Sequence, residues 1–229
     1  MEITWLGHGS FQWKLDSGEV ILLDPWLEGP TYPKDHVFDR IDAILVTHGH
    51  YDHVHGVPPL AIKFSPHVVA IYETCAWLES KGVKTACAMN KGGAQQVGPL
   101  TVTMTHAVHS CGIADEGQII YGGEAAGFVV TLPDGRRVYF AGDTSVFSDM
   151  SLIAEIYQPE LAFLPVGDLF TMGPREAAVA CRLLKVPKVI PMHFGSFPPL
   201  TGRPAELARL VKDTGTVIWP LEIGKPVNW

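Results

Sequence analysis

The feature that most constrains this chain is a cluster of metal-binding side-chain types placed directly after a short apolar run. Residues Ala43–Thr47 have the pattern of a buried strand, and the next six residues read His48-Gly-His50-Tyr-Asp52-His53. Imidazole nitrogen and carboxylate oxygen are the ligands that zinc, iron and manganese accept in proteins. Side chains two residues apart on an extended segment point the same way, so His48 and His50 can bind one ion together. A turn after them would direct Asp52 and His53 toward a neighbouring ion.

Three further residues can complete such a pair of sites, because four ligands cannot close two catalytic metal positions. His109 occurs in Ala-Val-His-Ser, Asp143 in Ala-Gly-Asp-Thr and His193 in Pro-Met-His-Phe, each near the end of a predicted strand. Taken alone, either histidine would more often be an ordinary core or surface residue, and the aspartate could be a turn residue beside Gly142. Together with the cluster at residues 48–53, they favour a binuclear metal site.

Strand patterns dominate both halves of the chain, and each half carries helices of its own. The turn Pro133-Asp134-Gly135 joins two strands as a hairpin. The predicted strands are Ile3–Leu6, Phe11–Leu15, Val20–Leu23, Ala43–Thr47, Val68–Tyr72, Leu100–Val108, Gly127–Leu132, Arg137–Ala141, Leu161–Val166, Val189–Met192 and Val217–Pro220.

Helices are predicted from capping residues and apolar periodicity. Thr74 is the expected N-cap of a helix that ends before Gly82, and Pro174 and Pro204 open two more. Another helix is expected near Asp149–Tyr157. These elements predict an α/β protein, a four-layer α/β/β/α sandwich of two mixed sheets packed face to face with outer helices, forming a single domain over residues 1–229. The inward faces are predicted to carry Ala177, Cys181 and Leu184 in one helix and Leu207, Leu210 and Val211 in the last.

The order of the ligand-type residues resembles the metallo-β-lactamase superfamily, in which HxHxDH is followed by a histidine, an aspartate and a final histidine. Longer segments are similar to the UPF0173 group, whose members are described as metal-dependent hydrolases. These segments are Trp-Leu-Gly-His-Gly-Ser-Phe at 5–11, Leu-Leu-Asp-Pro-Trp at 22–26, Ala-Gly-Asp-Thr at 141–144, Leu-Pro-Val-Gly-Asp-Leu-Phe-Thr-Met-Gly at 164–173 and Pro-Met-His-Phe at 191–194.

The resemblance implies a role for each ligand-type residue. His48, His50 and His109 would hold the first ion, Asp52, His53 and His193 the second, and Asp143 would bridge the two. The cofactors are therefore expected to be two divalent metal ions, with zinc favoured and manganese or iron as alternatives. Asp24 matches a superfamily motif whose carboxylate supports the metal-site loop through hydrogen bonds without binding metal.

Other residues near these motifs have weaker assignments. His106 precedes His109 by three residues and is expected to support or line the pocket, because the Ser after His109 fits the family motif. His8 is predicted either to line the metal pocket or to cap a buried turn. Cys111 is expected to be a buried or pocket-wall thiol, since the cysteine ligand of some relatives occupies the position of Asp143 here.

Composition narrows the choice of partners and compartment. The net charge is −7 and there is no Lys/Arg run, which argues against a nucleic-acid substrate. Apolar stretches are strand-sized, so no membrane insertion is expected, and no secretory signal is visible. The four widely spaced cysteines are expected to be free thiols in a reducing cytoplasm. A homo-oligomer is left open.

We therefore expect a metal-dependent hydrolase that acts on a small-molecule substrate: a small ester, lactone or phosphodiester. Two ions can share a water and lower its pKa toward neutrality, and Asp52 could accept a hydrogen bond from the resulting nucleophile as the catalytic carboxylate. Phe and Met residues in the segments 167–173 and 194–200 would form an apolar wall at the pocket, or merely pack those loops. The alternatives are an iron-dependent redox enzyme on the same fold and a non-catalytic, metal-stabilised binding module.

Overall fold

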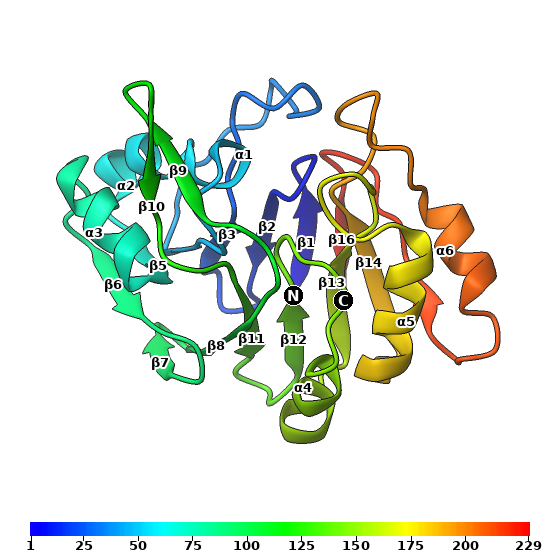
Figure 1. The fold of residues 1–229 in the computed structure, drawn as a ribbon. Helices are drawn as coiled ribbons and strands as arrows, with labels where there is room; N and C mark the ends of the chain where they lie inside the picture. The colour runs from blue at the N-terminus through cyan, green and yellow to red at the C-terminus, as the bar shows by residue number, and fades with distance from the viewer. The chain divides into compact units, whose positions relative to one another are not determined.

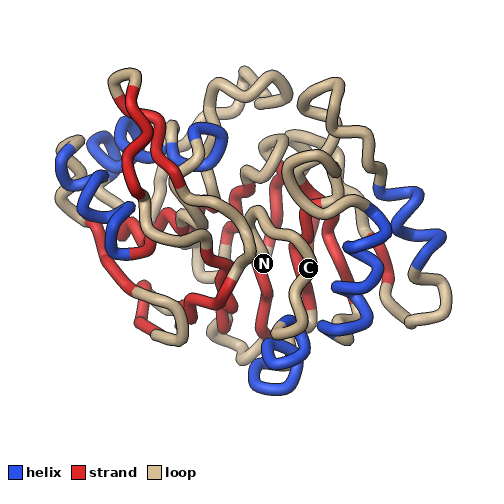
Figure 2. The backbone as a smooth tube through the Cα atoms, in the orientation of Figure 1, coloured by secondary structure: helices blue, strands red, loops and turns tan.

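The computed structural model describes all residues from 1 to 229. The chain divides into two compact units. Unit 1 contains Met1–Asn90, Ser110–Ala125 and Leu221–Trp229, and unit 2 contains Lys91–His109 and Ala126–Pro220. Each unit has one seven-stranded mixed sheet. Each also has its own helices (Figures 1 and 2). The prediction of an α/β fold with two mixed sheets is confirmed.

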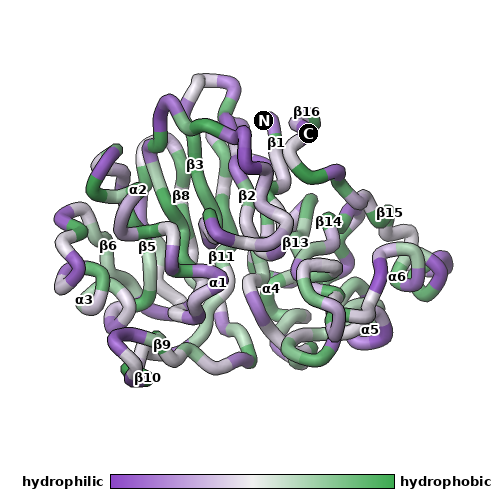
Figure 3. The backbone as a smooth tube through the Cα atoms, turned by 90° about the horizontal axis from the view of Figure 1, so that it is seen from above, coloured by the Kyte–Doolittle hydropathy of each residue, from purple (hydrophilic) through white to green (hydrophobic).

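The large sheet of unit 1 joins an antiparallel half to a parallel half. The C-terminal strand pairs with the first strand, while the third and fourth strands run parallel to each other. Hydrophobic residues concentrate on strands such as β3, and the connecting segments are more hydrophilic (Figure 3). In order across the sheet, the strands are β16 (Pro226–Asn228), β1 (Glu2–Trp5), β2 (Phe11–Lys14), β3 (Val20–Leu23), β4 (Ala43–Leu45), β5 (His67–Ile71) and β6 (Ala86–Met89).

Three helices accompany this sheet: α1 (Tyr51–Val54), α2 (Val57–Phe64) and α3 (Tyr72–Ser80). Val57 and Leu78 belong to the same buried cluster as Ile44 of β4, so α2 and α3 cover one face of the strands. Neither α1 nor α2 is predicted from the sequence. The predicted N-cap role of Thr74 is wrong, because α3 begins two residues earlier and the buried Thr74 hydroxyl donates a hydrogen bond to the carbonyl oxygen of Gly122.

A separate two-stranded hairpin also belongs to unit 1. Strands β9 (Gly112–Asp115) and β10 (Gln118–Tyr121) pair antiparallel across a two-residue turn. Glu116 and Gly117 both have positive φ, at 47° and 78°, as a type I′ turn requires. The side chain of Asp115 ties the hairpin to α3, since Asp115 Oδ2 accepts a hydrogen bond from Trp77 Nε1 at 2.9 Å and lies 2.7 Å from Lys81 Nζ.

The sheet of unit 2 is antiparallel at one side and parallel at the other. The predicted hairpin is present, with Gly135 at a φ of 88° in its turn. The predicted final strand is reduced to two residues, and β16 follows it in unit 1. Across the sheet, the strands are β15 (Val217–Ile218), β14 (Lys188–Met192), β13 (Leu161–Pro165), β12 (Arg137–Phe140), β11 (Ala126–Thr131), β8 (Leu100–His106) and β7 (Ala94–Val97).

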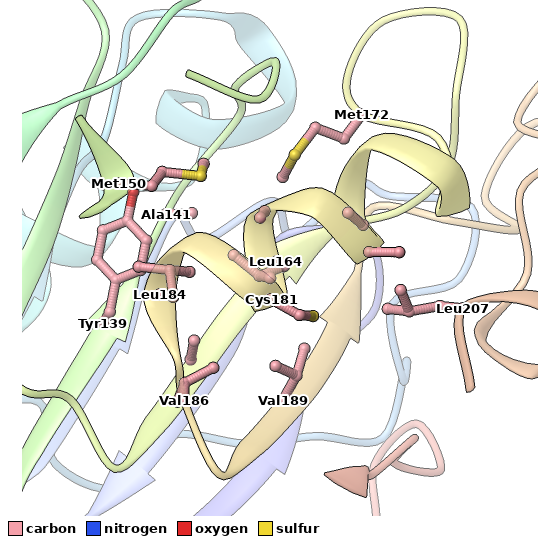
Figure 4. Packing of buried hydrophobic residues seen from close by; sticks show 14 of the residues in the cluster. Tyr139, Ala141, Met150, Leu164, Met172, Cys181, Leu184, Val186, Val189 and Leu207 are labelled. Carbon is pink, nitrogen blue, oxygen red and sulfur yellow. The ribbon is translucent and has the colours of Figure 1, made fainter. Parts of the chain in front are cut away.

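The helices of unit 2 are α4 (Met150–Tyr157), α5 (Pro174–Leu184) and α6 (Pro204–Leu210). Figure 4 shows how Cys181 and Leu184 of α5 pack with strand residues in one apolar cluster. The predicted inward face of α5 is confirmed. In α6 the prediction was wrong for Leu210, which is 36% exposed, whereas Leu207 and Val211 are buried.

Candidate metal centre

Parallel pairing of β3 and β4 brings Asp24 close to the segment that carries the histidine cluster. Leu23 pairs with Leu45, so the carboxyl ends of both strands lie at the same edge of the sheet. Asp24 follows β3 directly, and its N–H donates to the carbonyl oxygen of Leu45. Residues 48–50, named the ligand loop after the predicted ligands His48 and His50, follow β4 and lead into α1.

A buried carboxylate organises two of the histidines. Asp24 is completely buried, and its Oδ1 accepts the backbone N–H of Thr47 at 2.8 Å. Its Oδ2 accepts the Thr47 hydroxyl at 2.6 Å and lies 2.8 Å from His53 Nδ1. Because the Thr47 hydroxyl proton points to Asp24, Thr47 Oγ1 accepts the Nδ1–H of His48, 3.0 Å away. Asp24 thus orients His53 directly and His48 through Thr47.

These hydrogen bonds select the nitrogen that each ring can offer to a metal. With Nδ1 protonated, His48 and His53 both keep a lone pair on Nε2. His48 Nε2 lies 3.0 Å from Nδ1 of His50, so those two nitrogens face each other. Both oxygens of Asp24 take part in these hydrogen bonds, to Thr47 and to His53. Burial raises the pKa of the Asp24 carboxyl, and the interactions with His53 and Thr47 act in the opposite direction.

A second group of donors in unit 1 contains His8, Asp52 and His53. The three ligand atoms lie within 4.8 Å of one another. His8 Nε2 is 2.9 Å from Asp52 Oδ2, and the same oxygen is 3.9 Å from His53 Nε2. The His8 ring is buried and meets Trp26 edge-on, with 5.1 Å between ring centroids. These contacts place the His8 ring beside two of the predicted ligands, and the role of His8 stays a prediction.

Unit 2 brings together three of the predicted ligands. His193 follows β14 and Asp143 lies three residues after β12, so both stand at the carboxyl ends of strands in the parallel part of the sheet. Asp143 Oδ2 lies 3.0 Å from His193 Nε2 and 3.7 Å from His109 Nε2. Thr144 Oγ1 accepts the N–H of Val108 at 3.0 Å, which aligns the segment before His109 with the one that carries Asp143.

Backbone conformation is unusual at three of the predicted site residues. His8, Asp24 and His193 have φ values of 50°, 44° and 56°. A non-glycine residue in this left-handed region costs on the order of 1–3 kcal/mol, and such residues cluster at functional sites. Sequence patterns gave no sign of this strain.

The donor chemistry fits divalent metal ions. Imidazole nitrogens and carboxylate oxygens are the ligands of zinc, iron and manganese sites, and each unit holds several of them within a few ångströms. His106 lies outside these groups. It is exposed, with Nδ1 at 3.1 Å from Lys91 Nζ and its ring 5.3 Å from that of Phe147.

Comparison with known proteins agrees with this donor chemistry. The model of the β-lactamase superfamily domain matches residues 19–194. The chain belongs to the metallo-β-lactamase superfamily. It is 64% identical to a UPF0173 metal-dependent hydrolase of Solibacter usitatus, with 100% of both chains covered. It is 50% identical to a UPF0173 metal-dependent hydrolase of Koribacter versatilis, covering 93% of this chain and 92% of the relative.

A solved structure is similar over the same length. Igni18, described as a novel metallo hydrolase from Ignicoccus hospitalis, is 30% identical and has a TM-score of 0.88, covering 99% of this chain and 97% of its own. The protein is therefore a metal-dependent hydrolase of the UPF0173 group with the metallo-β-lactamase fold. None of its helices is long and apolar enough to cross a membrane.

Sequence reasoning missed part of the hydrolase site. The sequence predicts Thr47 only as the end of a strand, whereas in the structure its hydroxyl connects Asp24 to His48. A hydroxyl residue directly before a predicted ligand histidine is the available signal. Cys111 is buried, as predicted, and the structure adds that its Sγ accepts the N–H of Gly49.

Proposed function

We propose that this hydrolase works with two divalent metal ions, zinc by preference and manganese or iron as alternatives. His48, His50 and His109 would hold one ion, Asp52, His53 and His193 the other, and Asp143 both. The observation that carries this proposal is the buried Asp24 carboxylate, which fixes the orientation of His53 directly and of His48 through Thr47. Such supporting hydrogen bonds are a regular feature of protein metal sites.

The residues of the chain have separate tasks in hydrolysis. Bound divalent ions lower the pKa of water toward neutrality and polarise a carbonyl or phosphoryl oxygen. Asp52 can accept a proton or hydrogen bond from the attacking water. The Nε2–H of His8 donates to Asp52 Oδ2 and thereby fixes the carboxylate in one orientation. His53, whose ring is fully buried, would keep its Nε2 directed at the same place.

The proposed substrate is a small ester, lactone or phosphodiester. Leu169, Phe170 and Phe197 are 61%, 60% and 37% exposed in the loops after β13 and β14, which supports an apolar contact surface. Of the two roles left open for Met172, packing is the one that fits, because the residue is fully buried in the core of unit 2. The net charge of −7 argues against a polynucleotide substrate. Four free cysteines support a cytoplasmic location.

A substrate screen tests the proposal. Purified protein loaded with zinc or manganese is assayed on generic phosphodiester, lactone and ester substrates, and its metal content is determined. We expect two ions per chain and hydrolysis of at least one class. His50→Ala should lower kcat/KM more than about 100-fold, since even residues that only support metal ligands are worth 10–100-fold.

The control is His67→Ala, which removes an exposed imidazole from β5 and should leave the rate unchanged. Equal rates for wild type and His50→Ala on the same substrate would exclude the assigned site as the source of that activity.

A further inference from the structure

We propose that Ser110 and Cys111 are positioning residues that hold the ligand loop in its metal-binding conformation. The inference rests on the proposed function, because it concerns two ligands of one proposed ion. Ser110 contacts the side chain of His50, and Cys111 contacts the backbone between the two histidines. Two consecutive side chains therefore fix neighbouring points of the three-residue loop.

Cys111 links the loop to the base of the β9–β10 hairpin. Its Sγ accepts the N–H of Gly49 at 3.2 Å, and its S–H donates to the carbonyl oxygen of Gly122 at 3.2 Å. In the opposite direction, the N–H of Gly122 donates a hydrogen bond to the carbonyl oxygen of Cys111 at 3.0 Å. Thr74 Oγ1 of α3 donates to the same Gly122 oxygen at 2.8 Å. A buried chain of hydrogen bonds thus runs from α3 to the ligand loop.

The packing around Cys111 leaves no room for side chains at the two glycines it joins. A Cβ at Gly49 would lie 2.4 Å from Ile113 Cγ1, and a Cβ at Gly122 would lie 2.2 Å from the carbonyl oxygen of Cys111. Neither glycine has a positive φ, so close backbone approach is what requires glycine here. This approach lets the thiol reach the loop backbone directly.

Ser110 influences which ring nitrogen of His50 is free of a proton and can bind the ion. Ser110 Oγ lies 3.2 Å from His50 Nε2, whereas Nδ1 of the same ring faces His48 Nε2. A hydroxyl oxygen that accepts the Nε2–H keeps the proton on Nε2 and leaves the lone pair of Nδ1 for the ion. Without this partner, the ring can rotate or take the other tautomer, so the ion should bind more weakly.

The test measures metal affinity without substrate. Zinc dissociation constants are obtained by competition with a chromogenic chelator, and the visible spectrum of the cobalt(II) form reports the ligand geometry. We expect Cys111→Ala to weaken the binding of one ion by 10–100-fold and Ser110→Ala by about tenfold, with altered cobalt spectra. Cys111→Ser keeps a donor and an acceptor and should recover part of the affinity.

Two matched controls report on general effects of the substitutions. Cys75→Ala removes an equally buried thiol of unit 1 that bonds to the Ala70 carbonyl oxygen, and Ser80→Ala removes an exposed hydroxyl of α3. Both should bind zinc as wild type does. Ser110 is exposed, so Ser110→Ala keeps the test valid if Cys111→Ala does not fold.

Wild-type affinity and an unchanged cobalt spectrum in Ser110→Ala and Cys111→Ala would overturn the positioning roles. That result would leave the proposed hydrolase function intact. Conversely, failure of the wild-type protein to hydrolyse any tested substrate counts against the proposed function alone, since affinity is measured in the absence of substrate.

Discussion

At the scale of single residues, the Asp24 carboxylate connects several parts of the candidate site through hydrogen bonds. Its two oxygens accept three hydrogen bonds, and it adopts a positive φ while completely buried. Aspartate tolerates the left-handed region better than most residues, and its short side chain can reach both Thr47 and His53. This set of hydrogen bonds opposes the effect of burial on the carboxylate, although burial remains the larger influence on its pKa, and it orients His53 and Thr47.

Replacement of Asp24 by Asn should show how much the carboxylate contributes to metal affinity and how much to the stability of the fold. In Asp24→Asn an NH₂ group replaces one oxygen and faces a donor, so metal affinity should fall 10–100-fold. The free energy of unfolding of the metal-free protein should fall by about 1–3 kcal/mol. Chelator competition and urea unfolding measure the two effects. Asp42→Asn, which also alters a carboxylate bonded to a backbone N–H, should leave metal affinity unchanged. Wild-type affinity in Asp24→Asn would contradict the supporting role.

At the scale of elements, the sequence predicted those strands, turns and helix faces that depend on residues close together in the chain. The apolar run at 43–47, the turn at 133–135 and the apolar face of α5 were recognisable because periodicity and turn chemistry lie within a few residues. The hairpin β9–β10 was missed, since all four residues of β10 are exposed and show no alternation. Strand β16 was missed because it depends on pairing with β1 at the other end of the chain.

The candidate site, like the fold, was predictable only where it depends on local sequence. The ligand types could be predicted from His48-Gly-His50-Tyr-Asp52-His53 and from three strand ends. The supporting contacts could not, because Thr47, Ser110 and Cys111 carry no distinctive spacing and act only once segments distant in sequence meet. Which nitrogen of His50 faces His48 is likewise a property of the folded loop.

The tether between the hairpin and α3 gives a pH-dependent prediction. Hydrogen bonds from Lys81 and then Trp77 hold the pKa of Asp115 below its usual value of 3.8. A lowered pKa in the folded state means that the stabilisation is complete above about pH 4 and is lost as the pH falls through the folded-state pKa. Asp115→Asn should therefore lower the urea midpoint at pH 7, and its difference from wild type should shrink below pH 4.

Glu116→Gln is the matched control for this tether. Its carboxylate is 88% exposed and lies 3.8 Å from Lys81 Nζ, so the substitution should change the urea midpoint little. A constant difference between Asp115→Asn and wild type from pH 7 to pH 2.5 would show that the Asp115 charge is not the source of the stabilisation.

At the scale of the whole molecule, neither unit is a continuous stretch of chain. Unit 1 gathers three segments, and its two ends meet where the Met1 amino group donates to the Trp229 carbonyl oxygen at 3.2 Å. The proposed ligands are divided as well. His48, His50, Asp52 and His53 belong to unit 1, and His109, Asp143 and His193 to unit 2. The proposed assignment therefore uses residues of both units.

Removal of metal should accordingly destabilise the entire protein. An ion that binds only the folded state stabilises it by about 2.7 kcal/mol per site at a free concentration 100 times its dissociation constant. For a chain of this length, that corresponds to a rise in Tm of roughly 5–10 °C for each ion, or about 10–20 °C for the two proposed ions. We expect chelated protein to melt earlier by this amount and zinc to restore the Tm. His53→Ala removes a ligand of one proposed ion and should lose the part of the zinc response that comes from that ion, whereas His67→Ala, altered on the exposed end of β5, should keep the full response. If His53→Ala and wild type gain equal Tm from zinc, the ions responsible are bound somewhere other than the assigned ligands.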